Sequence, residues 1–127
     1  MGTLANPVGW FEIHVADMDR AQAFYTSVFK RELIDLPSPD ADMRMMMFAG
    51  EPNGSGAGGA LVKHPMKQPS TEGALVYFSC VDCAVECALA LQSGGKVFKE
   101  KFSIGSNGFI AIIGDSEGNA IGLHSFK

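Results

Sequence analysis

The chain has 127 residues, 46% of them hydrophobic and 19% charged, with a net charge of −4 at pH 7. This length fits one domain and leaves no room for a second, and the apolar fraction is typical of a folded globular protein. A nucleic-acid groove is disfavoured, because Lys and Arg are scattered along a chain of negative net charge. No apolar run approaches the roughly 18 residues that span a bilayer, and the first residues do not resemble a signal peptide. We therefore expect a cytoplasmic protein that binds neither nucleic acid nor membrane.

The first half of the chain predicts one strand, one helix and three further strands. Residues 9–15 alternate in polarity, which is typical of a strand. Its two faces carry Phe11, Ile13 and Val15 on one side and Trp10, Glu12 and His14 on the other. Asp17 is then the predicted N-cap of a helix whose apolar residues recur at helical spacing up to Val28. Short strands are expected at 33–36, 43–49 and 59–63, before a linker-like stretch at 64–70.

The same order of elements begins again after this stretch. A strand is predicted over 74–81, Asp82 takes the N-cap position that Asp17 holds, and a helix follows over 83–92. Further strands are expected at 96–99, 109–113 and 120–126, with a mobile loop over 102–108. The order βαβββ thus occurs twice at an offset of roughly 66 residues, which indicates an internal duplication. The single domain, 1–127, would consist of two modules, about 7–64 and 72–127.

Two such modules predict an α+β fold with a curled, mostly antiparallel sheet around a cavity and the helices outside. With an offset of 66, the strand faces expected against the helices are Phe11, Ile13 and Val15 in the first half and Tyr77, Ser79 and Val81 in the second. The faces expected to line the cavity are Trp10, Glu12 and His14, together with Val76, Phe78 and Cys80. Polar side chains in an otherwise apolar concavity are the usual features of a small-molecule site.

Residues 15–29, V-A-D-M-D-R-A-Q-A-F-Y-T-S-V-F, resemble the first-helix signature of the vicinal oxygen chelate superfamily. This superfamily includes glyoxalase I, the bleomycin and fosfomycin resistance proteins and the extradiol dioxygenases. Residues 94–97 and 115–121 are similar to its second-half landmarks, so the resemblance covers nearly the whole chain. It implies paired βαβββ modules, often in a homodimer, with the cavity inside the curled sheet.

The metal-dependent members of this superfamily place four ligands in the cavity, usually His, Gln or Glu, one on each of four strands. Carried over by motif, these positions fall on Trp10, Ala60, Val76 and Gly122. None of these side chains can hold a divalent cation. We therefore expect no standard metal centre and no cofactor.

Two other roles are open for the polar residues of the predicted cavity. Glu12, His14 and His124 could form a displaced two-His-one-carboxylate site for a divalent metal, in a metal-dependent lyase or dioxygenase. Alternatively, Glu12 and His14 could act as a metal-free acid/base pair, because burial beside Trp10 and Phe78 would raise the pKa of Glu12. A solvent-exposed Glu12 would remove this second hypothesis.

The preferred interpretation is a glyoxalase- or bleomycin-resistance-like protein that binds a small organic molecule without the standard metal centre. Its ligand-binding residues would be Trp10, Phe78 and His124, and its hypothetical catalytic residues Glu12 and His14. The chain would act as a homodimer, and whether it is an enzyme stays open here. An interaction module with a filled cavity is a third possibility.

Three cysteines, Cys80, Cys83 and Cys87, lie within eight residues. Their spacing suggests a metal site, but structural zinc takes four ligands and no fourth Cys or His lies nearby. We expect free thiols that pack as small hydrophobic side chains.

Overall fold

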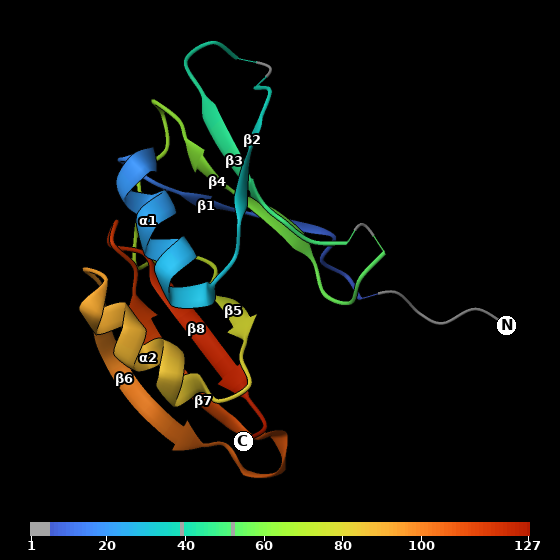
Figure 1. The fold of residues 1–127 in the computed structure, drawn as a ribbon, viewed down its shortest axis with the longest axis vertical. Coiled ribbons are helices and arrows are strands. Elements are labelled where there is room, and N and C mark those ends of the chain that lie inside the picture. Colours follow the sequence, from blue (N-terminus) through green and yellow to red (C-terminus); the bar gives the residue numbers. More distant parts are fainter. Residues whose placement is uncertain (1–5, 39, 52) are drawn as a thin grey trace, which may run out of the picture.

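The computed structural model describes residues 6–38, 40–51 and 53–127 (Figure 1). Across these residues the chain forms two α-helices and eight strands, which pair into two separate four-stranded sheets. Each sheet belongs to one half of the chain, and the element order βαβββ occurs twice. The predicted α+β fold of two tandem modules is confirmed. Neither of these helices has the length and apolar character needed to cross a membrane.

The first module contains β1 (Trp10–His14), α1 (Met18–Phe29), β2 (Leu33–Leu36), β3 (Arg44–Phe48) and β4 (Gly58–Lys63). The strand order is β1-β4-β3-β2, with β1 parallel to β4 and the other pairs antiparallel. Asp17 caps α1 as predicted, because its carboxylate accepts a hydrogen bond from the backbone N–H of Arg20. The helix ends at Lys30, which adopts the left-handed conformation with φ of 56°.

The second module contains β5 (Val76–Ser79), α2 (Cys83–Gln92), β6 (Lys96–Ser103), a short 3-10 helix (Gly105–Asn107), β7 (Phe109–Gly114) and β8 (Ala120–Ser125). The strand order β5-β8-β7-β6 repeats that of the first sheet. Asp82 caps α2 as predicted, by accepting from the N–H of Ala84. Strand β6 is longer than the expected 96–99, because two register shifts let it stay paired with β7 as far as Ser103. The segment predicted as a loop therefore begins in a strand.

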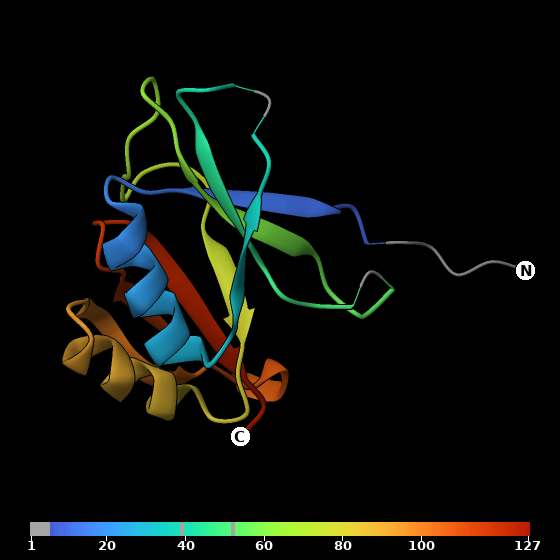
Figure 2. The same cartoon turned by 45° about the horizontal axis from the view of Figure 1, so that its top comes forward.

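One core joins the two modules, and α1 lies at its centre. Tyr25 of α1 places its ring 5.6 Å from that of Phe48 in the first sheet and 6.0 Å from that of Phe78 in the second. Phe29, one turn later, stacks on Phe78 at 4.2 Å. Figures 1 and 2 show α1 beside α2, with strands of both modules around it. The modules are thus held together by a shared aromatic cluster rather than by a linker alone.

A polar contact between the modules supplements this cluster. Asp115, buried at the end of β7, accepts hydrogen bonds from the Tyr25 hydroxyl at 2.7 Å and from the Asn119 amide at 2.9 Å. The same Asn119 amide donates to the backbone oxygen of His14 at 2.8 Å. These hydrogen bonds offset the cost of burying Asp115 and Asn119 where the turn between β7 and β8 packs under α1.

Glu117, in the same turn, reaches the start of α1. Its carboxylate accepts from the backbone N–H groups of Ala16 and Asp17 at 2.9 and 2.8 Å, and from the Arg20 guanidinium at 2.6 Å. Burial alone would raise the pKa of Glu117, but the hydrogen bonds from Arg20, Asp17, Ser116 and Ala16 outweigh it and lower the pKa. We call residues Asp115–Asn119 the clamp turn.

The predicted strand faces are confirmed in β1 and inverted in β5. Phe11 packs against Phe48 and Phe78 in the core, as expected for its face. Phe78 also lies in the core, whereas Tyr77 and Val81, expected against the helices, are exposed. The prediction that Phe78 lines the cavity is therefore wrong.

The cause of the inversion is an offset of one residue. The N–H of Val15 donates to Val62, and the N–H of Cys80 donates to His124 at the equivalent place in the second module. Val15 therefore corresponds to Cys80, an offset of 65 and not 66. Successive side chains of a strand point to opposite faces, so a slip of one residue exchanges them all.

Candidate functional site

Each sheet has one face toward the core and one face away from it, which we call the first and second open faces. Strand register assigns to the first open face Trp10, Glu12, His14, Ile34, Leu36, Met45, Met47, Gly58, Ala60 and Val62. It assigns to the second Tyr77, Ser79, Lys96, Lys99, Phe102, Ile110, Ile112, Gly114, Ala120, Gly122 and His124, and the Phe98 ring lies over Gly114 on the same face. Both faces are largely apolar, and the second carries Lys96 and Lys99 along β6.

Trp10 and Glu12 form a hydrogen-bonded pair on the first open face. The indole N–H of Trp10 donates to Glu12 Oε2 at 3.2 Å, and the ring lies over Gly58, 3.5 Å from where a Cβ of that residue would be. The Trp10 side chain is 43% exposed and Glu12 is also exposed. The predicted burial of Glu12 is wrong, and the acid/base hypothesis that depended on it is withdrawn.

His14 lies two residues further along the same strand, beside a pocket of about 240 Å³. This pocket lies where β1 meets the linker and β8, and its polar lining residues are Glu12, His14, Gln68, Ser70, Glu72 and Asn119. Burial lowers the pKa of His14 most, Glu12 opposes this shift, and Lys67 and His64 add to it. The neutral imidazole is thus favoured at pH 7.

His124 lies on the second open face and is held by its surroundings. Its Nε2 is 2.7 Å from the backbone oxygen of Asn107, to which it can only donate, and its ring meets Phe126 edge to face at 4.7 Å. It does not line the pocket that contains Glu12 and His14. Within the described residues no group of three or more His, Cys, Asp and Glu side chains could hold a metal ion. The displaced triad is therefore not assembled within one chain.

The four motif-based ligand positions do not fit a divalent metal either. Register places Ala60 next to Glu12 and Gly122 next to Tyr77. A Cβ on Gly122 would lie 2.5 Å from the Tyr77 ring, so this ring fills the space that a ligating side chain there would need. Trp10, Ala60 and Val76 offer no donor. These four positions therefore do not supply the ligand set that the resemblance implies for the metal-dependent members.

Tyr77 and Phe98 are the site residues that sequence reasoning missed. The Phe98 ring lies over Gly114 much as the Tyr77 ring lies over Gly122, since a Cβ on Gly114 would come within 2.9 Å of it. Glycine inside a strand often marks the close approach of another group. Gly122 inside β8 and Gly114 at the end of β7, each next to a strand with an exposed aromatic residue, were the signal that the sequence offered.

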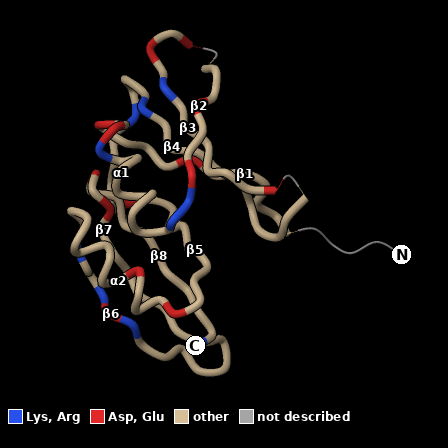
Figure 3. The backbone as a smooth tube through the Cα atoms, in the orientation of Figure 1, with Lys and Arg blue, Asp and Glu red and all other residues tan. Residues whose placement is uncertain are grey.

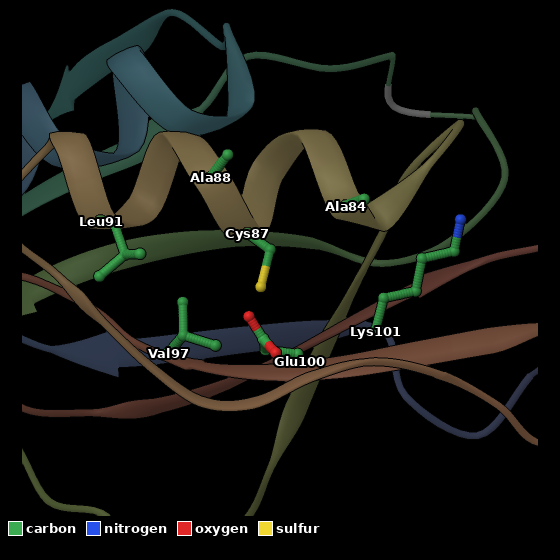
Figure 4. Close-up of a pocket in the computed structure, with 7 residues that line it drawn as sticks. All are labelled: Ala84, Cys87, Ala88, Leu91, Val97, Glu100 and Lys101. Atoms are coloured by element: carbon green, nitrogen blue, oxygen red, sulfur yellow. The ribbon is translucent and has the colours of Figure 1, made fainter.

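A second hollow, of about 300 Å³, lies between α2 and β6 and away from both open faces (Figure 4). Cys87 and Glu100 point toward one another across it. Burial raises the pKa of Cys87, and Cys83 and Glu100 add to the shift. Burial likewise raises the pKa of Cys80 to about 12. All three cysteines are free thiols, as predicted, and the raised pKa values make Cys80 and Cys87 poor nucleophiles.

Basic residues are distributed over several elements (Figure 3). Arg20 lies on α1, Arg44 on β3 and Lys63 on β4, while β6 carries Lys96, Lys99 and Lys101. Lys101 forms an ion pair with Asp82 at 2.8 Å and lies over the Phe109 ring. Several of these cations are thus engaged within the chain.

Comparisons with known proteins agree with this architecture. Residues 8–37 match the family model described as bleomycin resistance protein-like N-terminal. A mutant of glyoxalase I from Zea mays superposes with a TM-score of 0.73 at 18% identity, over 94% of this chain and 46% of that one. A member of the glyoxalase/bleomycin resistance protein/dioxygenase superfamily from Sphaerobacter thermophilus gives 0.70 at 20% identity, over 95% and 98%. TnmS3, an antibiotic binding protein from Streptomyces sp. CB03234, gives 0.63 at 23% identity, over 98% of each chain.

The fold is therefore that of the glyoxalase/bleomycin resistance protein/dioxygenase superfamily. The family-model match over residues 8–37 and this fold agree with the sequence resemblance to the vicinal oxygen chelate superfamily. The chain spans about half the length of the maize glyoxalase I chains that it matches. A search of curated proteins finds no match.

Proposed function

We propose that the protein binds a small organic molecule on its open faces without a divalent metal. The observation that carries this proposal is the set of aromatic side chains that these faces expose. Trp10 on the first open face is 43% exposed, and the three aromatic residues Tyr77, Phe98 and Phe102 on the second are 37–50% exposed. Large apolar side chains gathered on one surface mark binding sites in soluble proteins. TnmS3, which has the same fold, is described as an antibiotic binding protein, and this description supports the proposal.

The site would be completed by a second copy of the chain. In the part of the chain that the structure describes, the two sheets do not close into one barrel. A ligand on either open face would therefore leave its other side in water, whereas small-molecule sites bury most of their ligand. The maize chain is about twice as long as this one and has room for a second domain of this size. A homodimer of this chain would provide two domains of this size from two separate chains.

The three free cysteines fit a reducing compartment, so the proposed location is the cytoplasm. A metal-dependent lyase or dioxygenase that uses Glu12, His14 and His124 is not favoured, because the structure does not gather them in one chain.

Two measurements test the proposal. Protein purified without chelator or affinity metal should contain well under one metal ion per chain, and light scattering should give a mass near twice 13.5 kDa. A stoichiometric metal that is lost in Glu12→Gln would overturn the metal-free site, and a monomer would overturn the dimer.

The binding surface is tested with 8-anilinonaphthalene-1-sulfonate, whose fluorescence rises in apolar sites. We expect the native protein to bind it, and Tyr77→Ala with Phe98→Ala to weaken binding about tenfold, since each exposed ring contributes stacking area. Val85→Ala, which removes an exposed apolar side chain on α2, is the control. Equal losses in the control and in the double variant would exclude the open faces as the site.

A further inference from the structure

The geometry of the first open face points to a ligand of one chemical class: a planar aromatic ring system that carries a positive charge. The ring would stack on Trp10, and its cationic N–H group would donate to Glu12. This inference rests on the proposed function and specifies the ligand of the same site.

Trp10 is held in an orientation that suits stacking. Its ring lies over the strand at Gly58, where no side chain lifts it away from the sheet, and its N–H group is fixed by Glu12. An aromatic ring fixed before binding loses little conformational freedom when a ligand arrives. Since Trp10 stays 43% exposed, ring surface remains free for a ligand.

The neighbouring strand leaves room for a flat molecule only at Gly58, which is in register with Trp10, has no side chain and is exposed. Ala60, in register with Glu12, is fully buried and is not available to a ligand. Met47 pairs with Ala60 from the next strand and lies on the same face. The thioether of Met is flexible and polarisable, so it adapts to the edge of an aromatic ring. A globular molecule would touch the same surface over a smaller area.

The strand residues of this face carry a negative charge. Glu12 is the one carboxylate among the strand residues assigned above to the first open face, and none of them is Lys or Arg. The nearest strand cations, Arg44 and Lys63, lie in register with each other on the opposite face of the sheet. Arg44 contacts Asp19 and Asp35 there, at 3.3 and 3.7 Å. Burial lowers the pKa of His14 and favours its neutral form, and Lys67 of the linker, the cation that acts on His14, adds to this shift.

A Trp ring and a carboxylate side by side are complementary to an aromatic cation. The ring attracts a cation through its quadrupole, and the carboxylate accepts a charge-assisted hydrogen bond. A planar anion would meet the same ring but would be repelled by Glu12. Trp10 therefore selects for a planar ligand, and Glu12 selects for a positively charged one.

Three probes separate these features in calorimetric titrations at pH 7 and low salt. They are 9-aminoacridine, a planar cation; anthraquinone-2-sulfonate, a planar anion; and 1-adamantanamine, a globular cation. We expect 9-aminoacridine to bind at least about tenfold more tightly than either of the others. Trp10 is the only tryptophan in the chain, so quenching of its fluorescence reports contact at this site.

Substitutions assign the two contributions. Trp10→Ala should weaken 9-aminoacridine binding about tenfold, and Trp10→Phe should weaken it less, because a ring remains. Glu12→Gln should weaken binding of the cation about fivefold and leave the anion unchanged or bound more tightly, since this exposed charge is screened by solvent. Val85→Ala on α2 should change nothing. Thermal unfolding of each variant shows that it is folded.

The results distinguish the failure of this inference from that of the proposed function. Equal affinity for 1-adamantanamine and 9-aminoacridine, or unchanged cation binding in Glu12→Gln, would overturn the ligand class while binding of the naphthalene probe preserves the proposed function. Loss of specific binding for that probe as well as for these three would overturn both.

Discussion

The two helices occupy equivalent positions in the two modules and are used differently. Helix α1 buries large side chains, with Phe24 and Tyr25 at its centre, and exposes polar residues such as Asp19. Helix α2 buries small ones, Cys83, Cys87 and Ala90, and exposes Val85 and Leu91. The two modules thus share one backbone arrangement, but their helices pack through side chains of different size. The helix with aromatic side chains can fill the space between two sheets, whereas the helix with small ones covers a single sheet closely.

The largest difference between the helices should appear when a buried ring of α1 is removed. Tyr25→Ala removes a side chain that contacts Phe48 and Phe78 and donates to Asp115. We expect a loss of about 3–5 kcal/mol in the free energy of unfolding, measured in urea. Cys87→Ala in α2 removes one sulfur atom and should cost about 1 kcal/mol. Equal losses would contradict the central position of α1.

The second difference between the two helices lies at their starts, because the clamp turn contacts the start of α1. Glu117→Gln keeps the shape of the side chain but removes the charge that pairs with Arg20 and accepts from two backbone N–H groups. Because this side chain is fully buried, the expected loss of stability is about 2 kcal/mol. Asp82→Asn, which alters the more exposed cap of α2, is the matched control and should cost less than about 1 kcal/mol.

The same carboxylate predicts a dependence of stability on pH. The folded-state pKa of Glu117 lies below its ordinary value of 4.5, so its contribution is fully present above pH 4.5. This contribution to stability is lost as the pH falls through the lowered pKa of Glu117 in the folded state. Urea unfolding between pH 6 and pH 3 should therefore show a smaller acid loss in Glu117→Gln than in the wild type. If the wild type and Glu117→Gln lose stability equally between pH 6 and pH 3, Glu117 does not supply the acid sensitivity.

The smallest effect is expected on the outside of α2. Val85 is 55% exposed, so Val85→Gln should change the free energy of unfolding by less than about 0.5 kcal/mol. This variant and Tyr25→Ala then give the smallest and the largest losses of stability expected for the two helices. A loss above 1 kcal/mol would mean that the outer surface of α2 is covered in solution, which light scattering of wild type and variant would detect.

Much of this architecture could be predicted from local signals. Asp17 and Asp82 mark the two helix starts because a short acidic side chain satisfies free N–H groups there. Alternation placed Ile13 in the core and Trp10 outside it. The face of β5 was not predictable in the same way, because Tyr77, Phe78 and Val81 are all apolar and a one-residue offset reverses their directions.

The candidate site was predictable only in part. Trp10 and Glu12 were identified as neighbours on one strand face, and the structure joins them by a hydrogen bond. The exposure of Glu12 could not be read from the strand, because it depends on how far the linker and the second module cover that face. For the same reason His124 could be assigned to a strand but not to the neighbourhood of His14.

The sequence by itself determined the repeated βαβββ order, both helix caps, the free cysteines and the absence of donors at the four metal positions. These features depend on residues close together in the chain or on residue type alone. Only the tertiary structure decided that Tyr77 lies over Gly122, that Phe78 belongs to the core and that the clamp turn reaches α1. Each of these depends on the register between distant strands, which is set by the packing of the whole core and not by any local pattern.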